Sequence, residues 1–209
     1  MLTLAVDSAC PDDATIRRAA ELLRGGMVVA YPTDTLYGLA ADPASVRAIE
    51  QLYRMKGRQV DQAIPLIAAD LSQVERCAGP LPGTLRLLGE RFWPGPLTLI
   101  VSAWPGLAPL LHGGTGTVAI RVPAHEVARA LAQAFGAPIT STSANRSGEP
   151  PSNSPDAVRD ALGADLDVML DGGLSPGGPP STIVDARGER PRLVRAGAVP
   201  FDRVLECLQ

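Results

Sequence analysis

The 209-residue sequence contains few cysteines, histidines and aromatic residues. Its three cysteines stand far apart without Cys-x-x-Cys spacing, which favours free thiols in a reducing compartment over a disulfide framework or a zinc site. Aromatic residues make up 4% of the chain and the net charge is −3, which disfavours a stacking surface and a general affinity for polyanions. No apolar run approaches the roughly 18 residues of a membrane span, and residues 1–10 lack a basic signal-peptide start. We therefore expect a cytoplasmic protein without a membrane association.

The familiar catalytic motifs are missing or misplaced. The segment Gly173–Gly177 has the letters of a nucleophile elbow, but its proline prevents the required helix, and His112 and His125 both come earlier in the chain. The segment Gly114–Ala119 has the letters of a dinucleotide fingerprint, yet it leads into a predicted strand instead of a helix, and no P-loop is present. Cations, hydroxyls and backbone amides remain, with no predicted metal ligands in the protein. These groups suit reactions at phosphorus, where catalysis is mostly positioning and charge stabilisation.

Lysine is almost absent: Lys56 is the single lysine among 19 basic residues, and all the others are arginines. Lysine offers a compact ammonium where arginine offers a wide planar fork, so a surface position would accept either residue. Lys56 stands two residues before Arg58, with Gly57 between them. We interpret this segment as an anion site that needs a point charge. The alternative is a remaining surface lysine at a helix end.

Apolar runs and turn residues predict helices and short strands that alternate along the chain. Helices are expected at 13–24, from Asp42–Pro43 to Lys56, and at 71–78, 83–92, 125–135 and 154–162. Strands are expected at 27–31, 64–68, 97–101, 117–122, 138–142, 167–170, 181–184 and 192–195. The alternation, with no linker and no repeat, predicts an α/β fold: one domain over residues 1–209, with a twisted mixed open sheet flanked by helices.

Three loops that follow predicted strands are dense in hydroxyl groups or glycine, at 32–35, 141–148 and 172–181. Ligands of α/β proteins bind at strand ends, and hydroxyls with backbone N–H groups suit phosphate and carboxylate oxygens. Each hydroxyl alone is better explained as a turn or cap residue. Together with nearby arginines and Lys56, the loops predict a site for a polyanionic small molecule. The arginines are Arg58, Arg121, Arg146 and Arg195.

Six segments of the chain occur in the order found in one protein family. They are Tyr31–Leu39, Lys56-Gly57-Arg58, Phe92–Thr98, Arg121-Val122-Pro123, Ser141–Gly148 and Ser181–Asp185. This pattern resembles the YrdC/TsaC-like threonylcarbamoyl-AMP synthases over roughly residues 12–200. The Lys-x-Arg and Ser-x-Asn pairs are the family's signature. The chain looks like the short, single-domain type of that family.

The resemblance implies a nucleotidyltransferase that converts L-threonine, bicarbonate and ATP into threonylcarbamoyl-adenylate and pyrophosphate. A second enzyme system then passes the threonylcarbamoyl group to an adenosine of tRNA, and a direct tRNA contact is left open. Threonine's amine and bicarbonate would form a carbamate whose carboxylate attacks the α-phosphorus, so no side-chain base is needed. Lys56 and Arg58 would offset the repulsion between the two anions. Mg²⁺ is expected with the nucleotide, and no organic cofactor is expected.

Carried over residue by residue, the resemblance divides the site into two sides. ATP would be bound by Lys56, Arg58, Gln62, Thr117, Ser143, Asn145 and Arg195, of which Lys56, Arg58, Ser143 and Asn145 would also be catalytic. L-threonine would be bound by Thr35, Arg121, Ser141 and Ser181, with Arg121 holding its carboxylate.

Three positions depart from the family pattern. Gln59 replaces a proline, Gln62 stands in the Asn/Lys place, and Ile67 or a neighbouring alanine falls where the family often has histidine. Two other functions stay open on the residues alone. One is an RNA-binding module with a concave arginine-lined surface, and the other is a hydrolase or carbamoyltransferase-related domain. Nucleotide turnover that depends on threonine and bicarbonate would distinguish the synthase from both.

Overall fold

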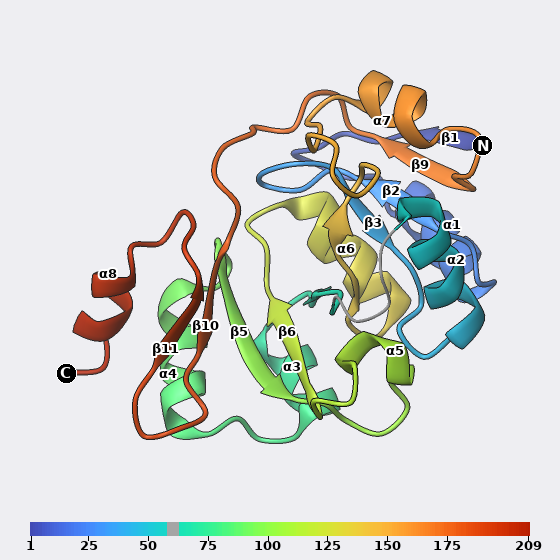
Figure 1. The fold of residues 1–209 in the computed structure, drawn as a ribbon. Coiled ribbons are helices and arrows are strands. Elements are labelled where there is room, and N and C mark those ends of the chain that lie inside the picture. Colours follow the sequence, from blue (N-terminus) through green and yellow to red (C-terminus); the bar gives the residue numbers. More distant parts are fainter. Residues whose placement is uncertain (58–62) are drawn as a thin grey trace.

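The computed structural model describes residues 1–57 and 63–209, whose strands form two sheets (Figure 1). Sheet A has the strand order β1-β9-β2-β3-β8, and sheet B has the order β11-β10-β5-β6-β4-β7. Both sheets mix parallel and antiparallel pairs. Sheet A consists of β1 Leu2–Ala5, β2 Val29–Tyr31, β3 Gly38–Ala40, β8 Thr142–Ser143 and β9 Val168–Asp171. Sheet B consists of β4 Leu66–Ile67, β5 Leu97–Ser102, β6 Thr117–Arg121, β7 Ile139–Thr140, β10 Thr182–Asp185 and β11 Arg192–Arg195.

Helices cover both faces of sheet A, because successive residues of strand β2 pack against different helices. Val29 and Tyr31 of β2 belong to the apolar cluster that holds α1 and α6, whereas Ala30 belongs to the cluster that holds α2. The cluster that holds α2 continues into sheet B through Leu97 and Ile120, so a shared apolar core joins the two sheets. The helices are α1 Asp13–Arg24, α2 Val46–Lys56, α3 Leu71–Ala78, α4 Gly83–Phe92, α5 Pro109–His112, α6 Glu126–Phe135, α7 Pro155–Leu162 and α8 Phe201–Glu206.

The ends of α2 follow local sequence signals and correct one prediction. The predicted start at Asp42–Pro43 is wrong, because α2 begins at Val46 after Ser45, whose hydroxyl accepts the Ala48 N–H at 3.2 Å. The helix ends after Lys56 because Gly57 takes the left-handed conformation, with φ 59°, that glycine adopts at little cost. This end places the only lysine of the chain at the last helical position.

The strand predicted at 138–142 is divided between the two sheets. Its first part, β7, pairs with β4 in sheet B, and its second part, β8, pairs with β3 in sheet A. Ser141 stands between them, and its N–H donates to the Pro65 carbonyl at 2.8 Å. Ser141 therefore lies where the chain crosses from one sheet to the other.

The predicted α/β class, with mixed strand pairing and flanking helices, is confirmed, although the strands are divided between two sheets. The sequence patterns do not predict β1, β3, α5 or α8. Across residues 1–57 and 63–209, no helix has both the length and the apolar character needed to cross a membrane.

Candidate active site

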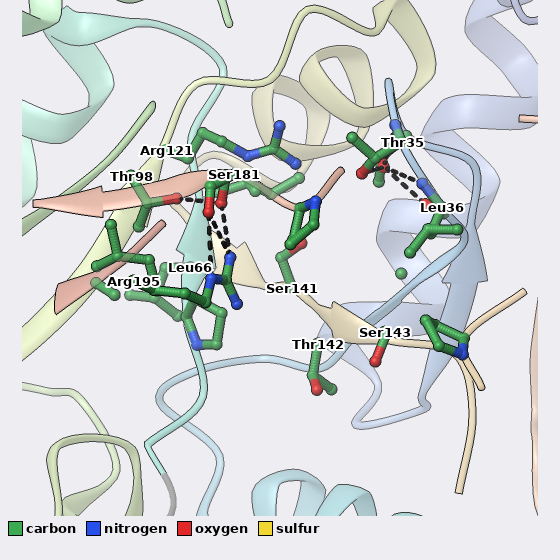
Figure 2. A pocket seen from close by; sticks show the side chains of 18 of the residues that line it. Thr35, Leu36, Leu66, Thr98, Arg121, Ser141, Thr142, Ser143, Ser181 and Arg195 are labelled. Carbon is green, nitrogen blue, oxygen red and sulfur yellow. Dashed lines mark hydrogen bonds between the residues drawn. The ribbon is translucent and has the colours of Figure 1, made fainter. Parts of the chain in front are cut away.

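A pocket of about 490 Å³ lies at the Ser141 crossing and is lined by both sheets (Figure 2). Arg121, Ser181 and Arg195 lie on one side of it, Thr35 and Leu36 lie on the other, and Ser141 stands between them. Apolar side chains that include Leu66, Ile67, Ile100, Ile183 and Val194 also line it. The polar residues in the described lining are Thr33, Thr35, Tyr37, Thr98, Arg121, Ser141, Thr142, Ser143, Ser181 and Arg195.

Arg121 is a nearly buried cation at the end of β6. Its Nη1 donates to both carboxylate oxygens of Asp34, at 2.8 and 2.9 Å, and its side chain is 8% exposed. Within residues 1–57 and 63–209, the Arg121 side chain donates its hydrogen bonds to Asp34 alone, through Nη1. The Nε and Nη2 donors are then available to a ligand, and this fork suits a carboxylate.

Ser181 is the centre of a polar cluster on the same side of the pocket. Its hydroxyl lies 2.7 Å from Thr98 Oγ1 and accepts from Arg195 Nη2 at 3.1 Å. Arg195 also donates from Nε and Nη2 to the Ser181 carbonyl, at 3.2 and 2.7 Å. Burial, followed by the positive charge of Arg121, lowers the pKa of Arg195. Two guanidinium groups thus lie close enough to repel each other, and an anionic ligand would relieve that repulsion.

Thr35 is presented to the pocket by a turn that Thr33 organises. The Thr33 hydroxyl accepts the N–H groups of Thr35 and Leu36, each at 3.2 Å, and donates to the Leu36 carbonyl at 2.6 Å. Thr33 is 3% exposed. Because Thr33 satisfies the backbone of the turn, the hydroxyl of Thr35 can face the pocket.

Lys56 lies behind the segment that follows β8. Its Nζ donates to the carbonyls of Ser143 and Asn145, at 2.5 and 2.7 Å, and to Asn145 Oδ1 at 3.3 Å. Asn145 Oδ1 also accepts the Ser143 hydroxyl at 2.5 Å. Lys56 is 3% exposed, so the alternative of a surface lysine is wrong. The ammonium instead holds the end of β8, where Ser143 lines the pocket, together with Asn145 just after it.

The structure brings most of the predicted site residues together. All four residues predicted on the threonine side line the pocket, as do Ser143 and Arg195 from the ATP side. Lys56 and Asn145 lie outside the described lining set but contact Ser143. Thr117 also lies outside that set, at the end of β6 opposite Arg121, with its hydroxyl 3.0 Å from Thr115 Oγ1.

Some positions singled out in the sequence fall elsewhere. Arg58, Gln59 and Gln62 lie outside the described residues. Arg146 does not belong to the described pocket lining and instead pairs with Asp165 at 2.9 Å. Ile67, one of the candidates for the position where the family often has histidine, lines the pocket with a purely apolar side chain. The roles of all these residues in binding and catalysis stay predictions.

Sequence reasoning did not single out Asp34, Thr98 or Tyr37. The Tyr37 hydroxyl donates to the Gly173 carbonyl at 2.8 Å and accepts the Gly172 N–H at 3.1 Å, which ties the loop 172–181 to the turn 32–35. Burial raises the pKa of Tyr37 to about 12, so the phenol stays protonated. All three residues lie inside the segments that resemble the family, at Tyr31–Leu39 and Phe92–Thr98. Their hydrogen-bond partners lie 83 to 136 positions away in sequence, so only the fold reveals these pairings.

The residues that the structure describes include no group of three or more histidine, cysteine, aspartate or glutamate side chains that could hold a metal ion. The polar side chains in the described lining of the pocket carry guanidinium or hydroxyl groups. Fold and pocket together define an α/β protein whose pocket presents guanidinium and hydroxyl groups.

Comparison with known proteins places this chain in a family. The sequence model of the Sua5/YciO/YrdC family, described as "Telomere recombination", matches residues 21–197. The chain therefore belongs to the Sua5/YciO/YrdC family.

Two relatives carry the name threonylcarbamoyl-AMP synthase. The protein from Bacillus subtilis is 39% identical over 199 residues, which cover 95% of this chain and 58% of that relative. The protein from Nitrosococcus oceani is 41% identical over 185 residues, which cover 88% of this chain and all of that relative. The chain thus spans little more than half of one synthase and the whole length of another.

A solved structure with the same fold contains a bound amino acid. The crystal structure of P. abyssi Sua5 in complex with L-threonine superposes with a TM-score of 0.93 at 34% identity. The match covers all of this chain and 61% of the P. abyssi chain.

Proposed function

We propose that this chain is an L-threonylcarbamoyladenylate synthase, a nucleotidyltransferase that uses L-threonine, bicarbonate and ATP. The observation that carries the proposal is the convergence of Thr35, Arg121, Ser141 and Ser181 on one pocket. These are the residues that the family resemblance assigns to threonine. The synthase names of the relatives and the threonine complex of P. abyssi Sua5 favour this function over an RNA-binding module or a hydrolase.

In this proposal Arg121 binds the α-carboxylate of threonine through the guanidinium edge that Asp34 leaves available. Ser141, Ser181 and Thr35 are placed to receive the amino acid's polar groups, while Leu66 and Ile67 offer an apolar surface to its methyl group. A difference of one methyl group supports a preference for threonine over serine of about 10–200-fold.

The chemistry then needs positioning more than a side-chain base. The amine of threonine takes up the carbon of bicarbonate, with loss of water, and becomes a carbamate. A carbamate oxygen attacks the α-phosphorus of ATP, the bond to the bridging oxygen breaks, and pyrophosphate leaves. Because both reactants are anions, the cations beside the pocket would lower the barrier by offsetting their repulsion. Arg195 lies in position to do so, and Lys56 and Arg58 are proposed to join it.

On the ATP side, Ser143 lines the pocket, with Asn145 and Lys56 directly behind it. Gln62, Thr117 and Arg195 complete the proposed ATP-binding set, and Lys56, Arg58, Ser143 and Asn145 are its proposed catalytic members. Mg²⁺ is proposed to arrive on the phosphates of ATP, where it would neutralise charge.

The adenylate would pass to a tRNA-modifying enzyme system that forms threonylcarbamoyladenosine. Transfer to tRNA requires the enzyme to work where tRNA is present, so the cytoplasmic location expected from the sequence stays part of the proposal. Pull-down of the tagged protein would test whether it binds the transfer enzymes and tRNA. Fractionation of the cells would test the location.

Isotope labelling tests the proposed chemistry directly. The purified protein is incubated with ATP, Mg²⁺, L-threonine and ¹³C-bicarbonate, and the products are analysed by mass spectrometry. The proposal predicts an adenylate that contains threonine and one labelled carbon. A threonyl-adenylate without the label would show that the amino acid's own carboxylate is activated, and the proposal would then be wrong.

A further inference from the structure

A buried ion pair joins the two halves of the pocket. Asp34 follows β2 of sheet A, and Arg121 ends β6 of sheet B, 87 positions further along the chain. Their side chains are 13% and 8% exposed, and both Asp34 oxygens accept from the same nitrogen, Arg121 Nη1. A guanidinium held in this way has little freedom to rotate.

The pair also fixes which edge of Arg121 faces the ligand. Nη1 is used by Asp34, so Nε and Nη2 form the fork that remains for a carboxylate. Asp34 itself is held, because its Oδ2 accepts the Ala124 N–H at 3.4 Å from the segment that follows β6. His125 is the next residue, and burial is the largest of the effects that lower its pKa, so this neighbour is neutral near pH 7.

Asp34 also balances charge around the pocket. Arg121 and Arg195 both line it, and the proximity of the two cations contributes to the lowered pKa of Arg195. A carboxylate on the far side of Arg121 offsets part of this positive charge without occupying the ligand's place. Without it, Arg121 would be repelled by Arg195 and would have no described partner to hold it.

We infer that Asp34 is a positioning residue for the amino-acid substrate: it fixes the Arg121 guanidinium across the gap between the sheets, with its Nε/Nη2 edge toward the substrate carboxylate. The inference rests on the proposed function, because it takes Arg121 as the carboxylate-binding residue. It assigns a function to a side chain that makes no described contact with the reacting atoms.

The chain offers a matched control for this inference. Asp185 at the end of β10 is also a shielded carboxylate, 9% exposed, and accepts from Arg187 at 2.8 and 2.9 Å and from Arg192 at 3.1 Å. It is not among the described residues that line the pocket. D185N therefore removes a similar ion pair and its contribution to stability without touching the site.

The test compares steady-state kinetics of wild type, D34N and D185N with varied L-threonine at saturating ATP, alongside melting curves. We expect D34N to raise the KM for L-threonine about tenfold to a hundredfold, with a much smaller change in the KM for ATP. D185N should lower the melting temperature with an unchanged KM for L-threonine. An unchanged KM in D34N would overturn the inference. A lower KM would also overturn it, because Asp34 would then compete with the substrate for Arg121.

Two further measurements keep the test decisive. R121K lacks the guanidinium fork, so D34N should raise the KM for L-threonine much less in an R121K background than in wild type. An equal rise in both backgrounds would mean that Asp34 does not act through Arg121. A crystal structure of D34N should show the Arg121 guanidinium displaced, and an undisplaced guanidinium would contradict the inference. If wild type consumes no ATP in the presence of threonine, the proposed function fails. The crystal structure of D34N would still show whether Asp34 positions Arg121.

Discussion

Replacement of Lys56 by arginine should abolish most activity although it keeps the charge. The ammonium is compact, and its acceptors among the described residues include the Ser143 carbonyl, the Asn145 carbonyl and Asn145 Oδ1. A planar guanidinium is larger and cannot place its donors on this compact set. Because Lys56 is 3% exposed, the extra volume must displace its neighbours, at a cost of about 1–3 kcal/mol.

The neighbours that would move are Ser143 and Asn145, at the edge of the pocket. Ser143 lines the pocket and its carbonyl accepts from Lys56, so the guanidinium of the Lys56→Arg variant would displace the end of β8. A displacement of about 1 Å in such a site can cost around a hundredfold in rate. Lys56→Ala would remove the donor of the Asn145 carbonyl in a buried hydrogen bond, at about 1–3 kcal/mol, and would leave the Ser143 carbonyl with the Asn145 N–H at 3.0 Å. This variant should fail to a similar degree.

The assay is steady-state pyrophosphate release by wild type, Lys56→Arg and Lys56→Ala, with melting curves to confirm that each variant is folded. Arg54→Lys is the matched control, because Arg54 is an exposed cation in the last turn of the same helix. Near-wild-type turnover by Lys56→Arg would refute the reasoning, since any cation at this position would then suffice.

Three further outcomes are expected. Ser143→Ala and Asn145→Ala should each lower turnover while the melting transition persists; a lost transition with normal specific activity in the folded fraction would make them structural turn residues only. Serine should replace threonine about 10–200-fold less efficiently in kcat/KM, because one methyl group is missing, and equal turnover would show that no methyl pocket exists. Hydrogen bonds from Arg187, offset in part by burial, leave the pKa of Asp185 well below its usual range, so its contribution to stability is present above about pH 4 and is lost as the pH falls. D185N should therefore flatten the acid side of the melting-temperature profile, and an unchanged profile would contradict this assignment.

Strong local signals in the sequence predict much of the fold. The helices expected at 13–24, 71–78 and 83–92 coincide with α1, α3 and α4. The strand β3 begins with Gly38, a weak strand former, and exists because β2 and β8 pair with it on either side. The first strand, β1, is mostly exposed and is held by parallel pairing with β9, more than 160 positions away. Such pairings have no local pattern, so the sequence does not predict them.

The candidate site likewise has parts that local sequence signals predict and parts that depend on distant segments. Hydroxyl-rich strand ends and the family resemblance together identify Thr35, Ser141 and Ser181. The split of the strand at Ser141 and the Asp34–Arg121 pair depend on how two sheets meet, and no spacing in the sequence encodes that geometry.

The most direct test of the synthase chemistry is to omit each substrate in turn while the nucleotide and phosphate products are measured. With ATP and Mg²⁺ present, we expect pyrophosphate and an AMP-level product only when L-threonine and bicarbonate are both supplied. Formation of ADP and inorganic phosphate, or pyrophosphate release without bicarbonate, would contradict the proposed adenylate chemistry.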